Sequence, residues 1–428
     1  MNQQATIHIG VFFDGTGNNQ ANATATLGSP ANGSYANARS NIALLHELYP
    51  TGKVGGRQHL KLYVQGIGTN QGQPDSLFAQ VTGRGGSGVM ARVEQALATL
   101  GERLAAQLRG GAGHVAFDLF GFSRGAAAAR HMANRLGAGE AGLPAALQGE
   151  RSINFIGLFD TVAAIVAPLR GNFDPANTRY DGLRLGLGKQ QARQQVQLVA
   201  GDERRRNFPL LRSENDIVVP GVHSDIGGGY LESMQEQVML SKPGSNRVPQ
   251  TTPVERTAAY AEADALLASD FADLADPRPR VLAWEESLAG NRARWEVAEK
   301  QVYAAVYRER EVYGHLSRVY LSIMRELAVR AGVPFAALGH DPAHQLPAEL
   351  QPLSRKLHDY ALGACPALQF TEGEDALLRG KYVHTSAHWN AFKGLRNSAL
   401  DYLYVDRPAQ AGRVMHDNPV DQAGFRAR

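Results

Sequence analysis

Residues 114–130 read HVAFDLFGFSRGAAAAR, and this stretch decides the fold class. Residues 115–119 form an apolar run typical of a buried strand, and the alanines at 126–129 favour a helix. Between them, Gly121-Phe122-Ser123-Arg124-Gly125 matches G-x-S-x-G, the nucleophile elbow, which places a serine on a strained strand-to-helix turn. Because strand and helix flank the motif as it requires, the stretch favours a nucleophilic Ser123 over a purely structural turn.

Predicted strands and helices alternate on both sides of this elbow. The predicted strands are residues 7–13, 60–64, 153–159 and 217–222, and the predicted helices are residues 40–48, 89–108 and a stretch around 190–199. Alternation of this kind is typical of an α/β fold with a mostly parallel sheet and helices on both faces.

A glycine-rich loop, Asp14-Gly15-Thr16-Gly17-Asn18-Asn19, follows the first predicted strand. In hydrolases with a nucleophile elbow, a loop after an early strand supplies one backbone N–H of the oxyanion hole, and the residue after the nucleophile supplies the other. Gly15 and Thr16 are candidates for the first role, and the backbone of Arg124 is a candidate for the second. A plain strand-to-helix loop is an equally good interpretation. A phosphate-binding loop is a poorer one, because no Lys-Ser or Lys-Thr follows the glycines.

Two later strand ends carry residues that could complete a catalytic triad. The strand at 153–159 ends in Asp160, where a carboxylate at the edge of the sheet could orient a histidine or merely cap a turn. The strand at 217–222 runs into His223, which is followed by three glycines at 227–229. Glycines permit a close backbone approach, and this favours a functional histidine at that point.

Composition narrows the class of protein. The chain has 428 residues and a formal net charge of +3, which does not indicate a nucleic-acid partner. Cys365 is the only cysteine, so an internal disulfide framework and a multi-cysteine metal site are excluded, and we expect neither a metal nor a cofactor. The N-terminus lacks the pattern of a secretory signal, and no run of eighteen apolar residues occurs. We therefore expect a cytoplasmic location in the producing cell and at most peripheral membrane contact.

Changes in composition and hydrophobic pattern along the chain predict four segments. Residues 1–230 are expected to form the core with the elbow, and residues 231–375 a mainly helical insertion that either covers the active site or is a structural cap. Residues 376–406 are expected to return to the core with a short strand near 381–384 and a helix, and residues 407–428 to form a polar tail. The charged run at 202–206 is typical of a solvated, self-paired face.

Seven blocks of the sequence resemble the signature blocks of one bacterial and fungal α/β-hydrolase family. They are VFFDGTGNN (11–19), GFSRGAAAAR (121–130), FIGLFDTVAA (155–164), GDERRRNF (201–208), PGVHSDIGGGY (220–230), LSRVYLSIMRELAVRAGVPF (316–335) and KYVHTSAHWN (381–390). That family, long catalogued as a domain of unknown function, includes the first family of type VI secretion lipase effectors. One departure is Gln197, where relatives often carry a histidine, which indicates a structural or variable position.

The resemblance implies an α/β-hydrolase fold and phospholipase A activity on membrane glycerophospholipids. It also implies delivery by a type VI apparatus into the periplasm of a rival bacterium, with a spike protein as carrier and an immunity protein as inhibitor in kin. Carried over residue by residue, the family's triad becomes Ser123, Asp160 and His223. Two other functions remain open: a soluble carboxylesterase of unknown substrate, and a catalytically dead adaptor of the secretion system.

A second assignment of the triad also remains open. In the usual α/β-hydrolase layout the acid follows the seventh strand and the histidine follows the eighth. By strand count, these positions fall on Asp225 and His384, and Asp160 then follows the sixth strand, an acid position that also occurs in this fold. We prefer His223 and place His384 in or beside the pocket.

Overall fold

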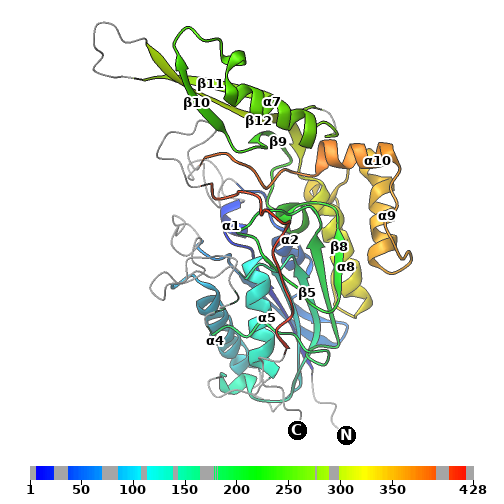
Figure 1. The fold of residues 1–428 in the computed structure, drawn as a ribbon. Coiled ribbons are helices and arrows are strands. Elements are labelled where there is room, and N and C mark those ends of the chain that lie inside the picture. Colours follow the sequence, from blue (N-terminus) through cyan, green and yellow to red (C-terminus); the bar gives the residue numbers. More distant parts are fainter. Residues whose placement is uncertain are drawn as a thin grey trace.

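A seven-stranded sheet forms the centre of the molecule (Figure 1). The computed structural model describes residues 6–23, 37–69, 85–107, 113–137, 143–163, 178, 180, 182–274, 277–288, 298–391 and 404–420. In spatial order, the strands are β2 (Gly52–Val54), β3 (Arg57–Val64), β1 (Ile7–Phe13), β4 (Val115–Phe122), β5 (Arg151–Phe159), β6 (Gln194–Ala200) and β8 (Asp216–Val219). Every neighbouring pair is parallel except the β2–β3 hairpin, so the prediction of a mostly parallel α/β sheet is confirmed.

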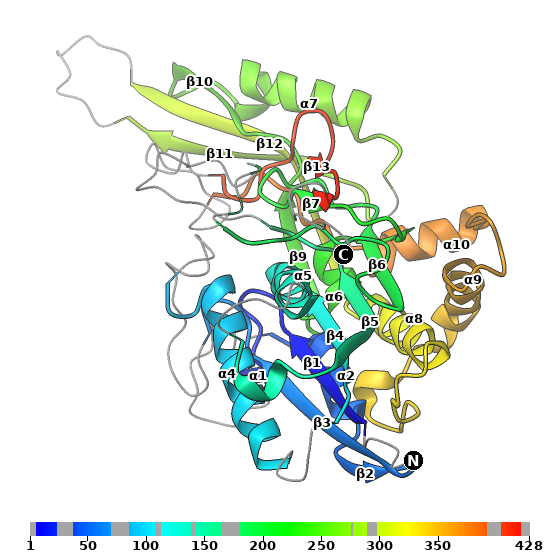
Figure 2. The ribbon, with the colours of Figure 1, turned by 90° about the horizontal axis from the view of Figure 1, so that it is seen from below.

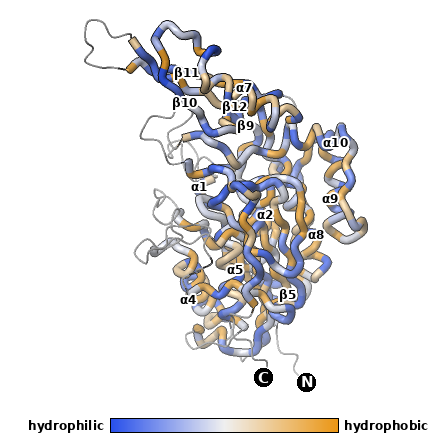
Figure 3. The backbone as a smooth tube through the Cα atoms, viewed as in Figure 1, coloured by the Kyte–Doolittle hydropathy of each residue, from blue (hydrophilic) through white to orange (hydrophobic). Residues whose placement is uncertain are grey.

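Helices cover both faces of this sheet, because successive side chains of a strand point to opposite sides. One face packs against α4 (Val89–Gln107) and α5 (Arg124–Gly137). The other face packs against α2 (Asn41–Leu48), α8 (Leu316–Arg330) and α9 (Gln351–Ala361). Figures 1 and 2 show α8 and α9 on the side of the sheet away from α4, and Figure 3 shows hydrophobic residues gathered between these layers.

A second sheet occupies the first part of residues 231–375, for which a mainly helical insertion was predicted, whereas the later part contains the helices α8 and α9. The strands β9 (Ser233–Met239), β10 (Gly244–Pro249) and β11 (Arg280–Ser287) all pair antiparallel with the long strand β12 (Glu299–Tyr313). One helix, α7 (Ala258–Asp270), packs on this sheet. The helical prediction was wrong here because Ala, Glu and Arg favour helices locally, whereas cross-strand pairing of the alternating residues of β12 decides the structure.

Helix α8 belongs to the main core rather than to an insertion. Its residues Tyr320, Ile323 and Met324 are fully buried against aromatic side chains of the central sheet, Phe155 among them. Short helices, η5 (Pro342–His344) and η6 (Ala348–Leu350), lead from α8 to α9.

The C-terminal part differs from the prediction in two ways. After α10 (Glu372–Leu377) comes a π-helical turn, Leu378–Tyr382, so no strand forms at 381–384. The helix predicted to follow falls largely on residues 392–403, which lie outside the described residues. The described part of the polar tail packs on the body, because β13 (Met415–His416) pairs in parallel with β7 (Leu210–Leu211), as Figure 2 shows.

Residues predicted as helical around 190–199 form β6 instead, and Val196, Leu198 and Ala200 of this strand contribute to the buried core. None of the described helices combines the length and apolar character needed to cross a bilayer.

Candidate active site

The G-x-S-x-G motif forms the strand–turn–helix that the sequence predicts. Strand β4 ends at Phe122, α5 begins at Arg124, and Ser123 between them has a φ of 58°, a conformation uncommon outside glycine. Both flanking glycines are sterically required: a Cβ on Gly121 would lie 2.5 Å from Ala126 Cα, and one on Gly125 would lie 2.2 Å from the carbonyl oxygen of Phe13. Ser123 therefore occupies a tight turn at the carboxyl end of a central strand.

Asp160 lies directly beside Ser123 on the neighbouring strand. The parallel register pairs Phe122 with Phe159, so that the next residue of each strand lies at the same level. The backbone N–H of Ser123 donates to the Phe159 carbonyl at 3.0 Å, and the N–H of Val162 donates back to the Ser123 carbonyl at 3.4 Å. Two backbone hydrogen bonds thus tie the elbow to the turn that carries Asp160.

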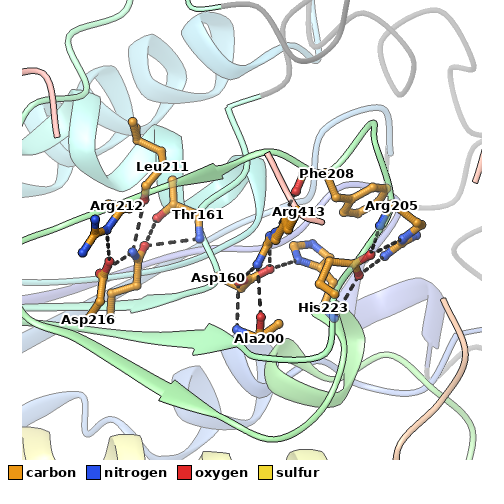
Figure 4. A network of polar contacts seen from close by, with 12 residues as sticks. Asp160, Thr161, Ala200, Arg205, Phe208, Leu211, Arg212, Asp216, His223 and Arg413 are labelled. Carbon is orange, nitrogen blue, oxygen red and sulfur yellow. Dashed lines mark hydrogen bonds and ion pairs between the residues drawn. The ribbon is translucent and has the colours of Figure 1, made fainter. Parts of the chain in front are cut away.

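His223 contacts Asp160, as Figure 4 shows, and also packs on Phe122 of the elbow. This residue begins the short helix α6 (His223–Gly227), and its Nδ1 lies 2.6 Å from Asp160 Oδ2, with both side chains buried. The imidazole lies between two aromatic rings, with centroid distances of 4.6 Å to Phe122 and 4.8 Å to Phe208. With Nδ1–H donated to a carboxylate, Nε2 is the nitrogen that can accept a proton.

Burial and charge set the ionisation of this pair. Burial lowers the pKa of His223, and the hydrogen bond and charge of Asp160 oppose the shift only in part. Burial alone would raise the pKa of Asp160, but the positive charge of Arg413 and the hydrogen bond from His223 outweigh it and hold the pKa below its ordinary value. The pair therefore consists of an ionised carboxylate and a neutral imidazole near neutral pH.

Arg413 is a residue of the site that the sequence analysis missed. Its Nη1 and Nη2 donate to the two oxygens of Asp160, each at 2.7 Å, and the backbone N–H of Ala200 donates to Oδ1 at 3.0 Å. This arginine lies in the segment predicted as a polar tail, and no local signal distinguishes it from the other basic residues there.

Glu203 is a second residue that the sequence analysis did not identify. One carboxylate oxygen accepts the backbone N–H of His223 at 3.2 Å and the guanidinium of Arg205 at 2.9 Å, and the other accepts Ser386 Oγ at 3.0 Å. The guanidinium carbon of Arg205 lies 3.4 Å from the ring centroid of Phe208. Burial would raise the pKa of Glu203, but Arg205 outweighs it and lowers the pKa to about 2. Glu203 and Arg205 of the run at 202–206 thus pair with each other, but the pair is shielded from solvent rather than solvated, and Asp202 of the same run pairs with Arg379 instead.

A second His–Asp pair lies two residues further along α6. Asp225 Oδ1 lies 2.6 Å from His384 Nδ1, and its Oδ2 accepts the backbone N–H groups of Val222 and His384. The ring of His384 stacks on Tyr230 with centroids 3.8 Å apart, and its buried Nε2 has no hydrogen-bond partner among the described residues. The structure thus joins the two second-choice residues, Asp225 and His384, to each other, and among the described residues the pair makes no hydrogen bond or ring contact with the elbow.

The loop after β1 offers one of its two candidate N–H groups. The N–H of Gly15 donates to the side chain of Asp14 at 2.7 Å and is therefore occupied. The N–H of Thr16 makes no hydrogen bond with the described residues. Gly125 packs against the carbonyls of Phe13 and Asp14, which brings this loop to the first turn of α5, where the N–H of Arg124 lies.

Gln197, the position that departs from relatives, is structural. Its side chain is fully buried, accepts hydrogen bonds from Thr161 and Arg130, and donates to the Leu211 carbonyl at 3.1 Å and to Asp216 Oδ1 at 2.7 Å. The amide ties β6 to the turn after β5 and to β7, and its partners Thr161, Leu211 and Asp216 are labelled on the left of Figure 4.

Comparisons with known proteins show the family of this chain and solved structures that are similar to it. The family model described as the catalytic domain of Tle1-like phospholipase effectors of the type VI secretion system (T6SS) matches residues 8–144 and 138–245. A solved structure of the Tle1 effector bound to the VgrG spike from the type 6 secretion system is 27% identical, with a TM-score of 0.76, and the alignment covers 97% of this chain and 94% of that one. A solved structure of an uncharacterized protein from Pseudomonas aeruginosa is 19% identical, with a TM-score of 0.43, and the alignment covers 88% of this chain and 53% of that one. No curated protein matches the chain.

Proposed function

We infer that this chain, which belongs to the Tle1-like phospholipase effector family of the type VI secretion system, is a serine hydrolase that acts as a phospholipase A on membrane glycerophospholipids. The match of the family model covers five of the seven sequence blocks, those between residues 11 and 230, and family membership supports a lipase effector. The serine mechanism, the acyl-ester bond that is cut and the residues of the triad are the proposal.

The proposed mechanism is a two-step acyl transfer. His223, oriented by Asp160, removes the proton of Ser123, whose Oγ attacks the ester carbonyl and forms an acyl-enzyme. The protonated His223 then passes its proton to the leaving alcohol. In the second step the same histidine activates water, which releases the fatty acid and regenerates Ser123. Backbone N–H groups of Thr16 and Arg124 stabilise the oxyanion in both steps.

The position of the Asp160–His223 pair carries this proposal. Asp160 leaves the strand next to that of Ser123, and backbone hydrogen bonds join the two turns. The His223 ring lies against Phe122, the residue immediately before the nucleophile. Ser123 Oγ makes no hydrogen bond with the described residues, and in unliganded hydrolases the nucleophile–base bond often tightens only with substrate. Asp225 and His384 form a comparable pair, but within the described part of the chain no hydrogen bond or ring contact joins them to the elbow.

We further propose an α/β-hydrolase organisation for the chain. Residues 1–230 supply the core sheet and the triad, helix α8 completes the core, and β9 to β12 with α7 form the inserted layer. By analogy with the relative that is bound to the VgrG spike, a spike protein is the proposed carrier. The proposed site of action is the periplasmic face of a target membrane, where binding is peripheral, and an immunity protein is the proposed inhibitor in kin.

Fatty-acid release from vesicles of phosphatidylethanolamine and phosphatidylglycerol tests the proposal. We expect turnover by the full chain, loss of turnover in Ser123→Ala, and wild-type turnover in Ser269→Ala, which changes an exposed serine on α7. Activity confined to short-chain nitrophenyl esters would instead support the soluble carboxylesterase. Absence of turnover on every ester would support the adaptor, and full activity of Ser123→Ala would exclude the serine mechanism.

A further inference from the structure

We propose that Arg413 is a positioning residue for the triad acid, and that the C-terminal strap, residues 404–420, is an integral part of the active site. The inference rests on the proposed function, because it assigns Asp160 to the triad. It adds a residue that lies 253 positions away from Asp160 in the sequence, in a segment that the sequence analysis treated as a polar tail.

The C-terminal strap is anchored on both sides of Arg413. On the N-terminal side, Arg206 N–H donates to the Arg407 carbonyl at 3.1 Å, and Ala409 N–H donates to the Arg204 carbonyl at 2.9 Å. On the C-terminal side, β13 pairs with β7, and the Leu210 N–H donates to the Val414 carbonyl at 2.9 Å. The segment 204–212 therefore holds the strap on both sides of Arg413 and fixes where its side chain enters the site.

All of the nitrogens of the Arg413 guanidinium are used within the site. Nε donates to the Phe208 carbonyl at 2.9 Å, while Nη1 and Nη2 each contact one oxygen of Asp160. The side chain is only 7% exposed. A bidentate arginine–carboxylate pair fixes the plane of the carboxylate, and here that plane presents Oδ2 to His223. Orientation matters at this position because Asp160 has a φ of 44°, a backbone conformation that surrounding contacts must maintain.

The charge of Arg413 also affects His223 through Asp160. The charged groups around the imidazole are Asp160, Glu203 and Arg205, with Arg413 on the far side of Asp160. Because Arg413 already neutralises much of the charge of Asp160, the carboxylate stabilises the imidazolium less than an uncompensated carboxylate would. A purely structural ion pair elsewhere in the fold would have no such effect on the proton affinity of the base.

The test compares the pH dependence of ester turnover in the full chain and three variants. In Arg413→Met we expect kcat to fall about 100-fold, as for a mispositioned catalytic group, and the midpoint of the acidic limb to rise by about one pH unit. Arg413→Lys keeps the positive charge but loses the bidentate contact with Asp160. In this variant we expect the acidic limb to keep its wild-type midpoint and kcat to be about tenfold lower. The matched control is Arg407→Met, an exposed arginine on the same strap, which should behave as wild type.

A folded Arg413→Met variant with the wild-type midpoint and kcat would overturn the inference. If that variant does not fold, a wild-type kcat in Arg413→Lys would overturn it equally. Ser123→Ala, measured in parallel, distinguishes failure of the proposed role of Arg413 from failure of the proposed function. If Ser123→Ala is inactive and the Arg413 variants match the wild type, only the role of Arg413 fails. If Ser123→Ala is active, the proposed function itself fails.

Discussion

Ser123 and Asp160 lie at the same level on adjacent parallel strands, and they are the two non-glycine residues with positive φ, 58° and 44°, in the described part of the chain. Left-handed conformations cost a non-glycine residue about 1–3 kcal/mol each and persist only where the surroundings maintain them. Here the two strained turns are hydrogen-bonded to each other, so the strain is concentrated at the positions of the proposed nucleophile and the proposed acid.

The first prediction concerns the elbow itself. Gly125→Ala should lower the free energy of unfolding by about 1–3 kcal/mol, because its Cβ would lie within 2.2–2.4 Å of the carbonyl oxygens of Phe13 and Asp14. We expect ester turnover to fall in the same variant. The backbone must shift to relieve the clash of the new Cβ with these carbonyl oxygens, and the shift moves Ser123 away from the loop after β1. Urea denaturation measures the first effect. Gly149→Ala is the control, because its Cβ would meet nothing within 4 Å, and equal stability losses in the two variants would contradict the prediction.

The second prediction separates the two His–Asp pairs. Asp160→Asn should reduce kcat about 10⁴-fold, because an amide at this position stabilises the wrong tautomer of His223. The matched change Asp225→Asn leaves Asp160 and His223 in place, so its kcat should stay within about tenfold of the wild type. Single-turnover release of nitrophenol measures both. If Asp225→Asn proved the more damaging change, the triad would be Ser123, Asp225 and His384.

The sequence predicted those parts of the site that depend on local pattern. Ser123 follows from a five-residue motif between a strand and a helix, and Asp160 and His223 were found because parallel strands bring their carboxyl ends to one edge. Arg413 was not predictable, because its contact with Asp160 joins residues that no periodicity or motif relates.

Predictions from helix and strand preferences were also wrong where cross-strand pairing outweighs local composition. The alanines and glutamates of β12 favour a helix, but each residue of the strand pairs with β9, β10 or β11, and alternate side chains such as Val302 and Val306 are buried. The prediction for 202–206 failed for a related reason. A charged run is predicted to be solvated from its composition alone. In the folded chain, however, Glu203 of this run is buried and accepts a hydrogen bond from the backbone N–H of His223.

The third prediction concerns that buried carboxylate. Glu203→Gln should lower the free energy of unfolding by about 3–5 kcal/mol, because it leaves Arg205, whose side chain is only 12% exposed, without its main counter-charge. The control is Glu326→Gln, which removes the partly exposed ion pair with Arg330 on α8 and should cost less than about 1 kcal/mol. Chemical denaturation at neutral pH compares the two, and a similar cost in both would show that Glu203 does not balance a buried charge.

The last prediction is the pH dependence of ester turnover. The proposed base acts only when neutral, so kcat/KM should fall as the pH drops through the pKa of His223. Burial lowers that pKa from its ordinary value of 6.5, so the midpoint should lie below 6.5. Asp160 does not add a second transition in this range, because Arg413 and His223 hold its pKa below the ordinary value of 3.8. Rates on a soluble ester from pH 4 to pH 8, with thermal unfolding followed over the same range, should therefore give a single acidic limb while the chain remains folded. A midpoint above 6.5 in the wild type would mean that Asp160 stabilises the imidazolium more than burial disfavours it, and that Arg413 does not offset the charge of Asp160 as the contacts indicate.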